Sequence, residues 1–556
     1  MFVRWSRYFL PTRKDAPAEA SPRLRLMLRA GLIRRLEPGL YGFLPLGCRA
    51  LEKIERIVRE EMTELGALEI RLPRLRPAAR GNGLASKDLH LTDGKGRRFG
   101  LGSSHASAAI SLIGGDVNSW RDLPLLFCCE GSGYRDTVGS WAREFPLYEA
   151  FGFFADQGSR EETHRYMLRA YSRVLARCGL GFRTAEVPNE ASEDGSSLAV
   201  VVFEEEGDEE IAWCTSCGYA ASRCLADVGS PGPPPGTEKA LELVETPGVR
   251  TVEGLVEFLG VSPAQVVKTF LYVGKRGTVG VLVRGDHELE EEKLRRALGD
   301  RSLRRVDDPD EAQAIAGAPF GFLGPVGLSV PIWADKAVRD IPAAVVGGNR
   351  EGYHYVGAKA GRDFRVEGFL DLRRVREGDP CGRCGAPLRI RKGIRVAELL
   401  RMGAAGLTFS DRDGRVKPVL AGQYSLELHR LLEAVVEKHH DDFGIVWPVE
   451  IAPFHVVIAV LRPDVPEQIR VAERMASALG ASGLDVLLDD RDRSPGEKFH
   501  DAKLIGAPVM LVVGHRALKR GEIEAERRWD GARASFPAEP TEVLHGVWGL
   551  LRAERG

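Results

Sequence analysis

Four cysteines form two CxxC pairs, and this is the strongest local signal of chemistry in the chain. The pairs are Cys214-Thr-Ser-Cys217 and Cys381-Gly-Arg-Cys384, each followed at once by glycine. Two such tight turns can supply four thiolates, which is the ligand set of a structural, tetrahedral Zn²⁺ site. Two unrelated cysteine pairs remain the alternative. A catalytic redox motif is disfavoured because neither pair opens a helix.

Chain length, net charge and the length of apolar runs limit the classes of protein to which this chain can belong. A chain of 556 residues exceeds a single core and predicts three or four domains. The net charge of −1 carries no global signature of nucleic-acid binding, so any RNA contact must be local. No apolar run approaches the roughly 18–20 residues of a membrane helix, so no membrane partner is expected.

Nine cysteines without a secretory signal indicate a reducing compartment, and we expect a cytoplasmic protein. The basic opening MFVRWSRYFLPTRK leaves a transit peptide as the alternative.

The elements that must position the cysteines follow from periodicity. Residues 21–67 have helical spacing, interrupted by the Gly/Pro turn EPGLYGFLPLG. The segments PLLFCCEGSGYRD and EFPLYEAFGFFA predict an antiparallel hairpin, and residues 160–180 predict a helix. After residue 450, the runs VVIAV, DVLLDD and VMLVVG alternate with helical segments, which predicts a parallel or mixed sheet.

A compact α/β unit over residues 246–372 follows the Pro/Gly linker VGSPGPPPGTEK. The two cysteine pairs lie on either side of this unit. Bringing the pairs together would therefore separate the unit from the rest of the chain as an insertion.

Three blocks of the chain resemble prolyl-tRNA synthetases of the bacterial type. The blocks are LMLRAGLIRRLEPGLYGFLPLGCRALEKIERIVREEM, the central VVKTFLYV…VLVRGDHEL…FGFLGPVGL…GYHYVGA, and the tail LLDDRDRSPGEKFHDAKLIGAP. The resemblance implies an α+β and α/β multidomain fold: a class II antiparallel-sheet catalytic body, an inserted α/β editing domain and an α/β anticodon-binding domain. The domain bounds that we expect are 1–223 and 377–450 for the body, 224–376 for the insertion and 451–556 for the tail.

The amino-acid-activating site departs from the family pattern. Arg135 and Arg430 match the two arginines that bind ATP in class II enzymes. At other positions the charged or small residue of the family is missing. Thr137 stands in place of a glutamate, and Ala106 stands in place of the glutamate of a Thr-His-Glu loop. In the glycine-rich third motif, the larger residues Ser425, Leu426 and Glu427 are present. The segments Ser197–Val200 and Gly393–Glu398 diverge as well. Five such losses predict that proline is not activated, and His105 is expected to be a packing residue.

The insertion keeps the family's editing residues. The resemblance assigns Lys268, the Gly321-Phe-Leu-Gly-Pro325 loop, Asp335 and His354 to a pocket that positions an ester and a water. A pocket that admits alanine and excludes the proline ring would act as a second sieve. For an isolated lysine or histidine, a solvated strand end or a packed core residue would be the simpler interpretation.

The tail gathers positive charge in one strand–loop–helix segment. By resemblance, Arg491, Arg493, Lys498 and Lys503 face the anticodon loop of tRNA(Pro). A solvated basic surface is the alternative.

These observations predict a prolyl-tRNA synthetase homologue that binds tRNA(Pro), does not activate proline and hydrolyses mischarged Ala-tRNA(Pro). The expected cofactor is structural Zn²⁺, with ATP and Mg²⁺ only if ligase activity survives, and the expected assembly is a homodimer. A functional proline–tRNA ligase with a divergent pocket and a non-catalytic tRNA-binding regulator remain the alternatives.

Overall fold

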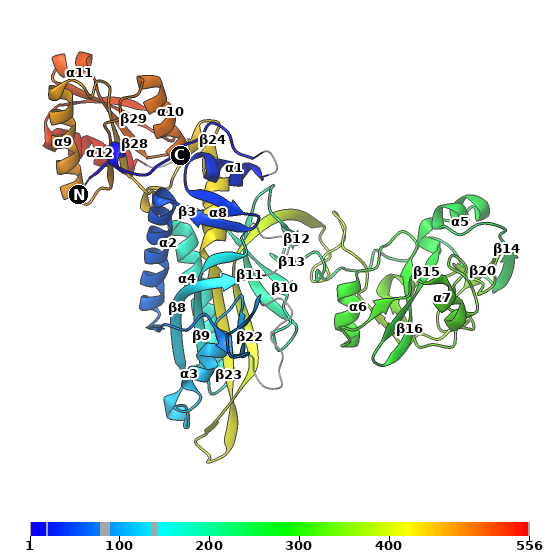
Figure 1. Ribbon diagram of the computed structural model, residues 1–556. Helices are drawn as coiled ribbons and strands as arrows, with labels where there is room; N and C mark the ends of the chain where they lie inside the picture. Colours follow the sequence, from blue (N-terminus) through cyan, green and yellow to red (C-terminus); the bar gives the residue numbers. More distant parts are fainter. Residues whose placement is uncertain (1, 18–19, 78–88, 136–141, 554–556) are drawn as a thin grey trace. The chain divides into compact units, whose positions relative to one another are not determined.

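The computed structural model describes residues 2–17, 20–77, 89–135 and 142–553, and its chain contacts divide it into two compact units (Figure 1). Unit 1 comprises Met1–Thr184, Ala191–Gly207 and Gly393–Gly556. Unit 2 comprises Ala185–Glu190 and Asp208–Lys392, so it contains the predicted insertion and both cysteine pairs. In the described part of the chain, no helix is both long and apolar enough to cross a membrane.

Unit 1 is built on a sheet that is antiparallel except for its edge strand β4, which pairs with β8 in parallel. Its strands, in spatial order, are β11 (Ser196–Phe203), β22 (Leu388–Ser410), β23 (Val416–Glu427), β9 (Glu144–Phe154), β8 (Leu125–Tyr134) and β4 (Leu68–Glu69). The predicted hairpin is confirmed, because β8 and β9 pair along their full lengths. Most of β9 is buried, since both of its faces are covered. One face packs on the largest core cluster, and the other packs beneath α3 (Ala106–Ile113).

Four helices cover the face of this sheet that packs on the largest core cluster. They are α1 (Pro22–Arg29), α2 (Pro45–Glu64), α4 (Gln157–Arg177) and α8 (Leu428–Lys438). The amphipathic spacing of α2 turns Ala50, Ile54, Ile57 and Val58 into the core, where α2 packs on α4 and α8.

The prediction of continuous helix before the Gly/Pro turn is wrong for residues 33–36. Helix α1 ends at Arg29, and Gly31 adopts φ +76°, a left-handed conformation that glycine allows. The chain then forms a hairpin of β2 (Ile33–Glu37) and β3 (Leu40–Phe43). The apolar spacing of the segment fits a helix equally well, so only the glycine and the EPG turn distinguish the two structures.

The tail forms a mixed six-stranded sheet with helices packed against it. The spatial order is β1 (Val3–Arg4), β27 (Val486–Asp489), β26 (Val456–Val460), β28 (Val509–Val513), β29 (Glu522–Arg527) and β30 (Arg533–Pro537). The first four strands are parallel, which confirms the predicted βαβαβ pattern, and the last two are antiparallel. The helices are α9 (Pro466–Ala481), α10 (Pro495–Ile505), α11 (His515–Lys519) and α12 (Pro540–Arg552).

Unit 2 contains two sheets and a small base. The larger sheet runs β17 (Arg304–Arg305), β15 (Val267–Gly274), β16 (Gly277–Arg284), β18 (Ile332–Asp335) and β21 (Gly368–Leu370). The smaller one runs β14 (Glu242–Glu245), β20 (Tyr353–Ala358) and β19 (Ala344–Gly347). Its helices are α5 (Val252–Leu259), α6 (Glu291–Leu298) and α7 (Pro309–Ala316). At the base, β12 (Glu209–Cys214) pairs with β13 (Ala220–Ser222).

Candidate functional sites

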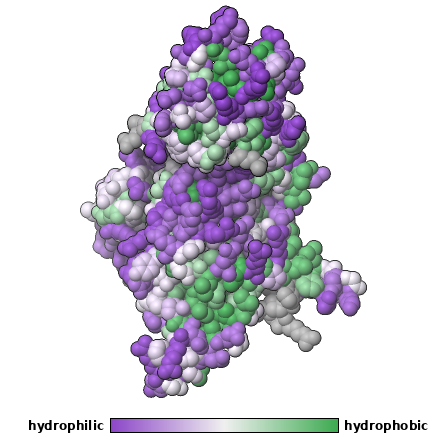
Figure 2. All heavy atoms as spheres, turned by 90° about the vertical axis from the view of Figure 1, so that its left-hand side faces the viewer, coloured by the Kyte–Doolittle hydropathy of each residue, from purple (hydrophilic) through white to green (hydrophobic). Residues whose placement is uncertain are grey.

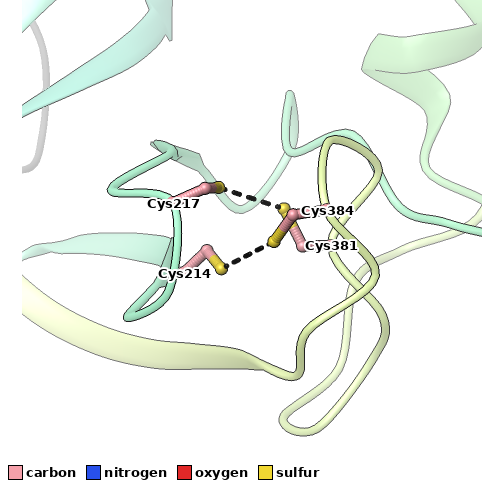
Figure 3. Close-up of side chains that lie close together, drawn as sticks. All are labelled: Cys214, Cys217, Cys381 and Cys384. Carbon is pink, nitrogen blue, oxygen red and sulfur yellow. Dashed lines mark hydrogen bonds between the residues drawn. The ribbon is translucent and has the colours of Figure 1, made fainter.

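The two CxxC pairs come together at the base of unit 2, as the sequence predicts (Figure 3). The Sγ atoms of Cys214 and Cys384 lie 3.5 Å apart, and those of Cys217 and Cys381 lie 3.8 Å apart. Four thiolates around a zinc ion with Zn–S bonds of about 2.3 Å are separated by about 3.8 Å. The four sulfurs therefore fit a Zn²⁺ ion, which would tie the two ends of the unit together.

Backbone geometry aims the cysteine turns at this site. Gly218 and Gly385 adopt φ +74° and +76°, which closes each turn after its second cysteine. The pKa of Cys214 is lowered to about 6, first by a hydrogen bond from the backbone of Cys217. A thiolate is the metal-binding form of cysteine, so this turn favours the ligand state.

A cavity of about 300 Å³ in unit 2 brings together three of the four predicted editing residues, Lys268, Gly321 and His354. Other residues from α5, β15 and the loop after α7 complete its wall. They are Arg250, Thr251, Val252, Leu255, Val266, Val267, Thr269, Phe270, Leu271, Arg305, Val306, Phe320, Leu323, Val345 and Gly347. The wall is mainly apolar with a few charged groups, as is typical of a small-ligand site.

Lys268 stands on β15 with its side chain half-buried, and its ammonium donates a hydrogen bond to the carbonyl of His287. Burial is the main cause that lowers the pKa of Lys268. The carbonyl contact fixes the position of the ammonium while leaving it able to meet an anionic group of a ligand.

His354 is buried on β20 and both of its ring nitrogens are engaged. Nε2 lies 3.1 Å from the carbonyl oxygen of Gly321, and Nδ1 lies 2.7 Å from Oγ1 of Thr246. Burial lowers the pKa of His354, so the ring is neutral at physiological pH and carries one proton. Because a carbonyl only accepts, Nε2 carries that proton, and the hydroxyl of Thr246 donates to Nδ1. The sequence offered no signal for Thr246.

The loop that contains Gly321 has little room for side chains. Gly321 has φ +92°, and a Cβ there would lie 2.8 Å from Cβ of Arg250. The side chain of Asn349 clamps the loop: it accepts from the N–H of Gly324 at 2.7 Å and donates to the carbonyls of Gly324 and Val326. Sequence reasoning missed Asn349, although its place in a Gly-Gly-Asn turn could have drawn attention to it.

Asp335, the fourth predicted editing residue, lies outside the cavity wall. Its carboxylate is fully buried and accepts from the backbone N–H groups of Ala337, Leu372 and Arg373 at 3.0, 2.9 and 3.1 Å. In this position it joins the end of β18 to the segment that leaves the insertion.

The two arginines assigned to ATP are both paired with carboxylates in unit 1. Arg135 forms an ion pair with Glu427 and lies 4.3 Å above the ring of Phe145. Arg430 is buried and lies 2.9 Å from Glu433. Leu426 of the altered third motif and the preceding Tyr424 are fully buried. The Thr137 substitution lies outside the described residues.

The four predicted RNA-binding residues of the tail differ in exposure. The side chain of Arg493 is 61% exposed, whereas Lys498 is fully buried and donates to the carbonyls of Val460 and Asp489. Arg491 pairs with Asp489 and Asp501 and stacks 3.7 Å above Trp5. Lys503 lies 2.8 Å from Glu526. Arg493 is thus the most accessible of the four.

Comparison with known protein families identifies two domains of the chain. Residues 246–364 match the aminoacyl-tRNA editing domain family, and residues 455–540 match the anticodon binding domain family. The proline–tRNA ligase of Thermotoga neapolitana is 40% identical over 99% of this chain and 97% of its own. That of Geobacter metallireducens is 37% identical over 98% of this chain and 99% of its own.

A solved structure shares the fold. Prolyl-tRNA synthetase from Cryptosporidium parvum, complexed with halofuginone and AMPPNP, superposes with a TM-score of 0.55 at 12% identity. The match covers 95% of this chain and 78% of that one. Since the relatives match along almost their full length, the chain belongs to the proline–tRNA ligase family and is a class II synthetase homologue with an inserted editing domain and a C-terminal anticodon-binding domain.

Proposed function

We propose that the insertion hydrolyses mischarged Ala-tRNA(Pro). The observation that carries the proposal is the cavity of unit 2, where Lys268, the Gly321 loop and His354 meet at one wall. The match of this region to the editing domain family supports the same activity.

The chemistry required is the cleavage of one ester bond. Water attacks the carbonyl carbon of the alanyl group, the bond to the ribose oxygen breaks, and that oxygen takes up the proton that the water gives up and leaves as the ribose hydroxyl. The ammonium of Lys268 can hold a terminal phosphate of the tRNA. In the glycine loop the N–H groups of Phe322 and Gly324 already donate to Pro319 and Asn349, so the groups that can approach the developing oxyanion are those of Gly321 and Leu323. His354 holds this loop through the Gly321 carbonyl. The apolar wall offers a surface for the methyl side chain of alanine.

Proline–tRNA ligation is the second candidate function, and the comparisons favour it over loss of activation. The relatives that match along the full length of the chain carry the name proline–tRNA ligase. On this interpretation, ATP and Mg²⁺ are further cofactors, and Arg135 must exchange Glu427 for a phosphate.

The other proposed partners follow from the family and the surface. Binding of tRNA(Pro) would use the exposed basic residues of the tail, and a role in translation would be carried out in the cytoplasm. A homodimer would cover apolar surface of unit 1, where Leu68, Leu75 and Leu112 are exposed. Figure 2 shows hydrophobic side chains gathered toward the lower part of one face.

The deciding experiment compares hydrolysis of Ala-tRNA(Pro) and Pro-tRNA(Pro) by the wild type, Lys268→Ala and Lys275→Ala. Lys275 is the matched control because it is an exposed lysine at the turn that follows the same strand. We expect the wild type to hydrolyse Ala-tRNA(Pro) and to leave Pro-tRNA(Pro) intact. The rate of this hydrolysis should fall at least 100-fold in Lys268→Ala and stay unchanged in Lys275→Ala. Equal rates in the two variants would overturn the assignment of the cavity.

ATP–pyrophosphate exchange, run alongside, separates the candidates. Proline-dependent exchange would establish the ligase. Hydrolysis without exchange would establish an editing factor, and tight tRNA binding without either activity would leave a non-catalytic regulator.

A further inference from the structure

A second group of metal-binding side chains lies inside unit 1, far along the sequence from the four-cysteine site. His105, Cys129 and Glu149 each offer one ligand atom, and these atoms all lie within 4.8 Å of one another. All three residues are buried, with 5%, 2% and 1% of their surface exposed. They combine nitrogen, sulfur and oxygen donors in one place, a set that suits Zn²⁺ better than Mg²⁺ or Ca²⁺.

The fold explains why the three residues meet. Cys129 on β8 and Glu149 on β9 are direct cross-strand partners, so their side chains project from the same face of the sheet. His105 directly precedes α3, which packs on this face. Gly131 makes space for the imidazole, since a Cβ at that position would lie 2.8 Å from Cε1 of His105.

A surrounding layer of polar groups orients the carboxylate. Nε2 of Gln423 donates to one oxygen of Glu149 at 2.9 Å and to the hydroxyl of Ser104 at 2.9 Å. The other oxygen accepts from the backbone N–H of His105 at 2.9 Å and lies 2.7 Å from Nδ1 of the same residue. Such an outer layer is typical of built metal sites, where it fixes the ligands before the ion binds.

The charge of this group is incompletely compensated. Among the described residues, no lysine or arginine forms an ion pair with Glu149, and its only ionisable partner within 4 Å is His105. No hydrogen bond to the thiol of Cys129 is found in the same part of the chain. A buried carboxylate without a cation is costly, and a divalent ion would neutralise both the carboxylate and a thiolate.

We propose that His105, Cys129 and Glu149 bind a second Zn²⁺ ion inside the class II body. Three protein ligands leave one coordination position for water or a small ligand. The proposal is independent of the editing activity, because the site lies in unit 1 and the editing cavity lies in unit 2.

The test is the zinc content of the full-length protein, measured by elemental mass spectrometry after gel filtration. The wild type should hold two zinc ions per chain. Cys129→Ser and Glu149→Gln should each hold one, and Glu149→Gln keeps the shape of the side chain, so loss of folding does not explain its result. Cys128→Ser is the matched control: Cys128 is the adjacent buried cysteine, but its sulfur contacts the hydroxyl of Tyr148 at 3.4 Å instead. It should keep both ions.

Cobalt substitution separates the two sites. In Cys384→Ser protein loaded with Co²⁺, the thiolate-to-cobalt absorption that remains should decrease further when Cys129 is also replaced by serine. One zinc ion in the wild type, lost in Cys384→Ser and unchanged in Cys129→Ser and Glu149→Gln, would overturn the proposal. It would leave His105 and Glu149 as a hydrogen-bonded pair.

Discussion

At the scale of single residues, the neutral ring of His354 carries one proton, which can be on either of its two buried nitrogens. Nε2 keeps that proton and donates a hydrogen bond to the carbonyl of Gly321, so the hydroxyl of Thr246 is the group that donates to Nδ1. His354 therefore acts on the glycine loop and is not available as a free base. Its catalytic value depends on a threonine more than 100 positions earlier in the chain.

We expect Thr246→Val to slow hydrolysis of Ala-tRNA(Pro) about tenfold. The valine leaves Nδ1 without a donor, which costs about 1–3 kcal/mol, and 1.4 kcal/mol is tenfold in rate. Thr269→Val is the matched control, because Thr269 lines the same cavity and its hydroxyl has no hydrogen-bond partner among the described residues. Single-turnover deacylation measures both variants. Similar rates would show that Thr246 does not position the histidine.

At the scale of elements, α10 and the loop before it separate two kinds of basic residue. Arg493 lies in the exposed loop, whereas Lys498 on the helix donates to two backbone carbonyls at the C-terminal ends of β26 and β27. Both have the same charge and lie in the same family-like segment. The exposed loop leaves Arg493 in solvent, whereas the packing of the helix buries Lys498.

Arg493→Ala should weaken tRNA(Pro) binding several-fold and reduce the salt dependence of the affinity by about one counterion.

Lys498→Met should leave the affinity of the folded protein nearly unchanged but reduce its stability by about 1–3 kcal/mol, because two buried carbonyls lose their donor. Filter binding at several salt concentrations and thermal unfolding measure the two effects. The opposite pattern would mean that Lys498 turns outward to the RNA.

These elements also show what a sequence can predict. The β8–β9 hairpin and the parallel strands β26, β27 and β28 were predictable, because each strand contains a short apolar run of strand length. The cysteine site was predictable because spacing alone defines the ligand set. The contacts of Asp335 and Lys498 were not, since they satisfy backbone groups that approach only in the folded chain. The hairpin after α1 was missed because local period could not distinguish it from a helix.

At the scale of the whole molecule, the four-cysteine site belongs to unit 2 alone. Its sulfurs bring residues 214–217 next to residues 381–384, so a bound zinc ion would close the loop that contains the editing cavity. Unit 1 has its own large cores and no part in this site. The stability of the two units should therefore respond differently to the metal.

Cys384→Ser should lower the unfolding temperature of unit 2 by roughly 10 °C, since loss of a ligand removes several kcal/mol of metal binding that is coupled to folding. The transition of unit 1 should stay in place. Cys224→Ser is the control, because this half-buried cysteine lies in the same unit but outside the cluster. Differential scanning calorimetry resolves the two transitions. A parallel shift of both would mean that the units unfold as one.

The parallel pairing of β1 with β27 has a consequence for synthesis on the ribosome. Val3 and Arg4 pair with Leu487 and Leu488, which are made much later than they are. The segment that contains β1 must therefore wait for its partner strand until the class II body and the insertion have been synthesised. Those parts can fold meanwhile, but the β1 edge of this sheet closes only after β27 has left the ribosome. A substitution at Val3 or Arg4 would thus act on a late step of folding.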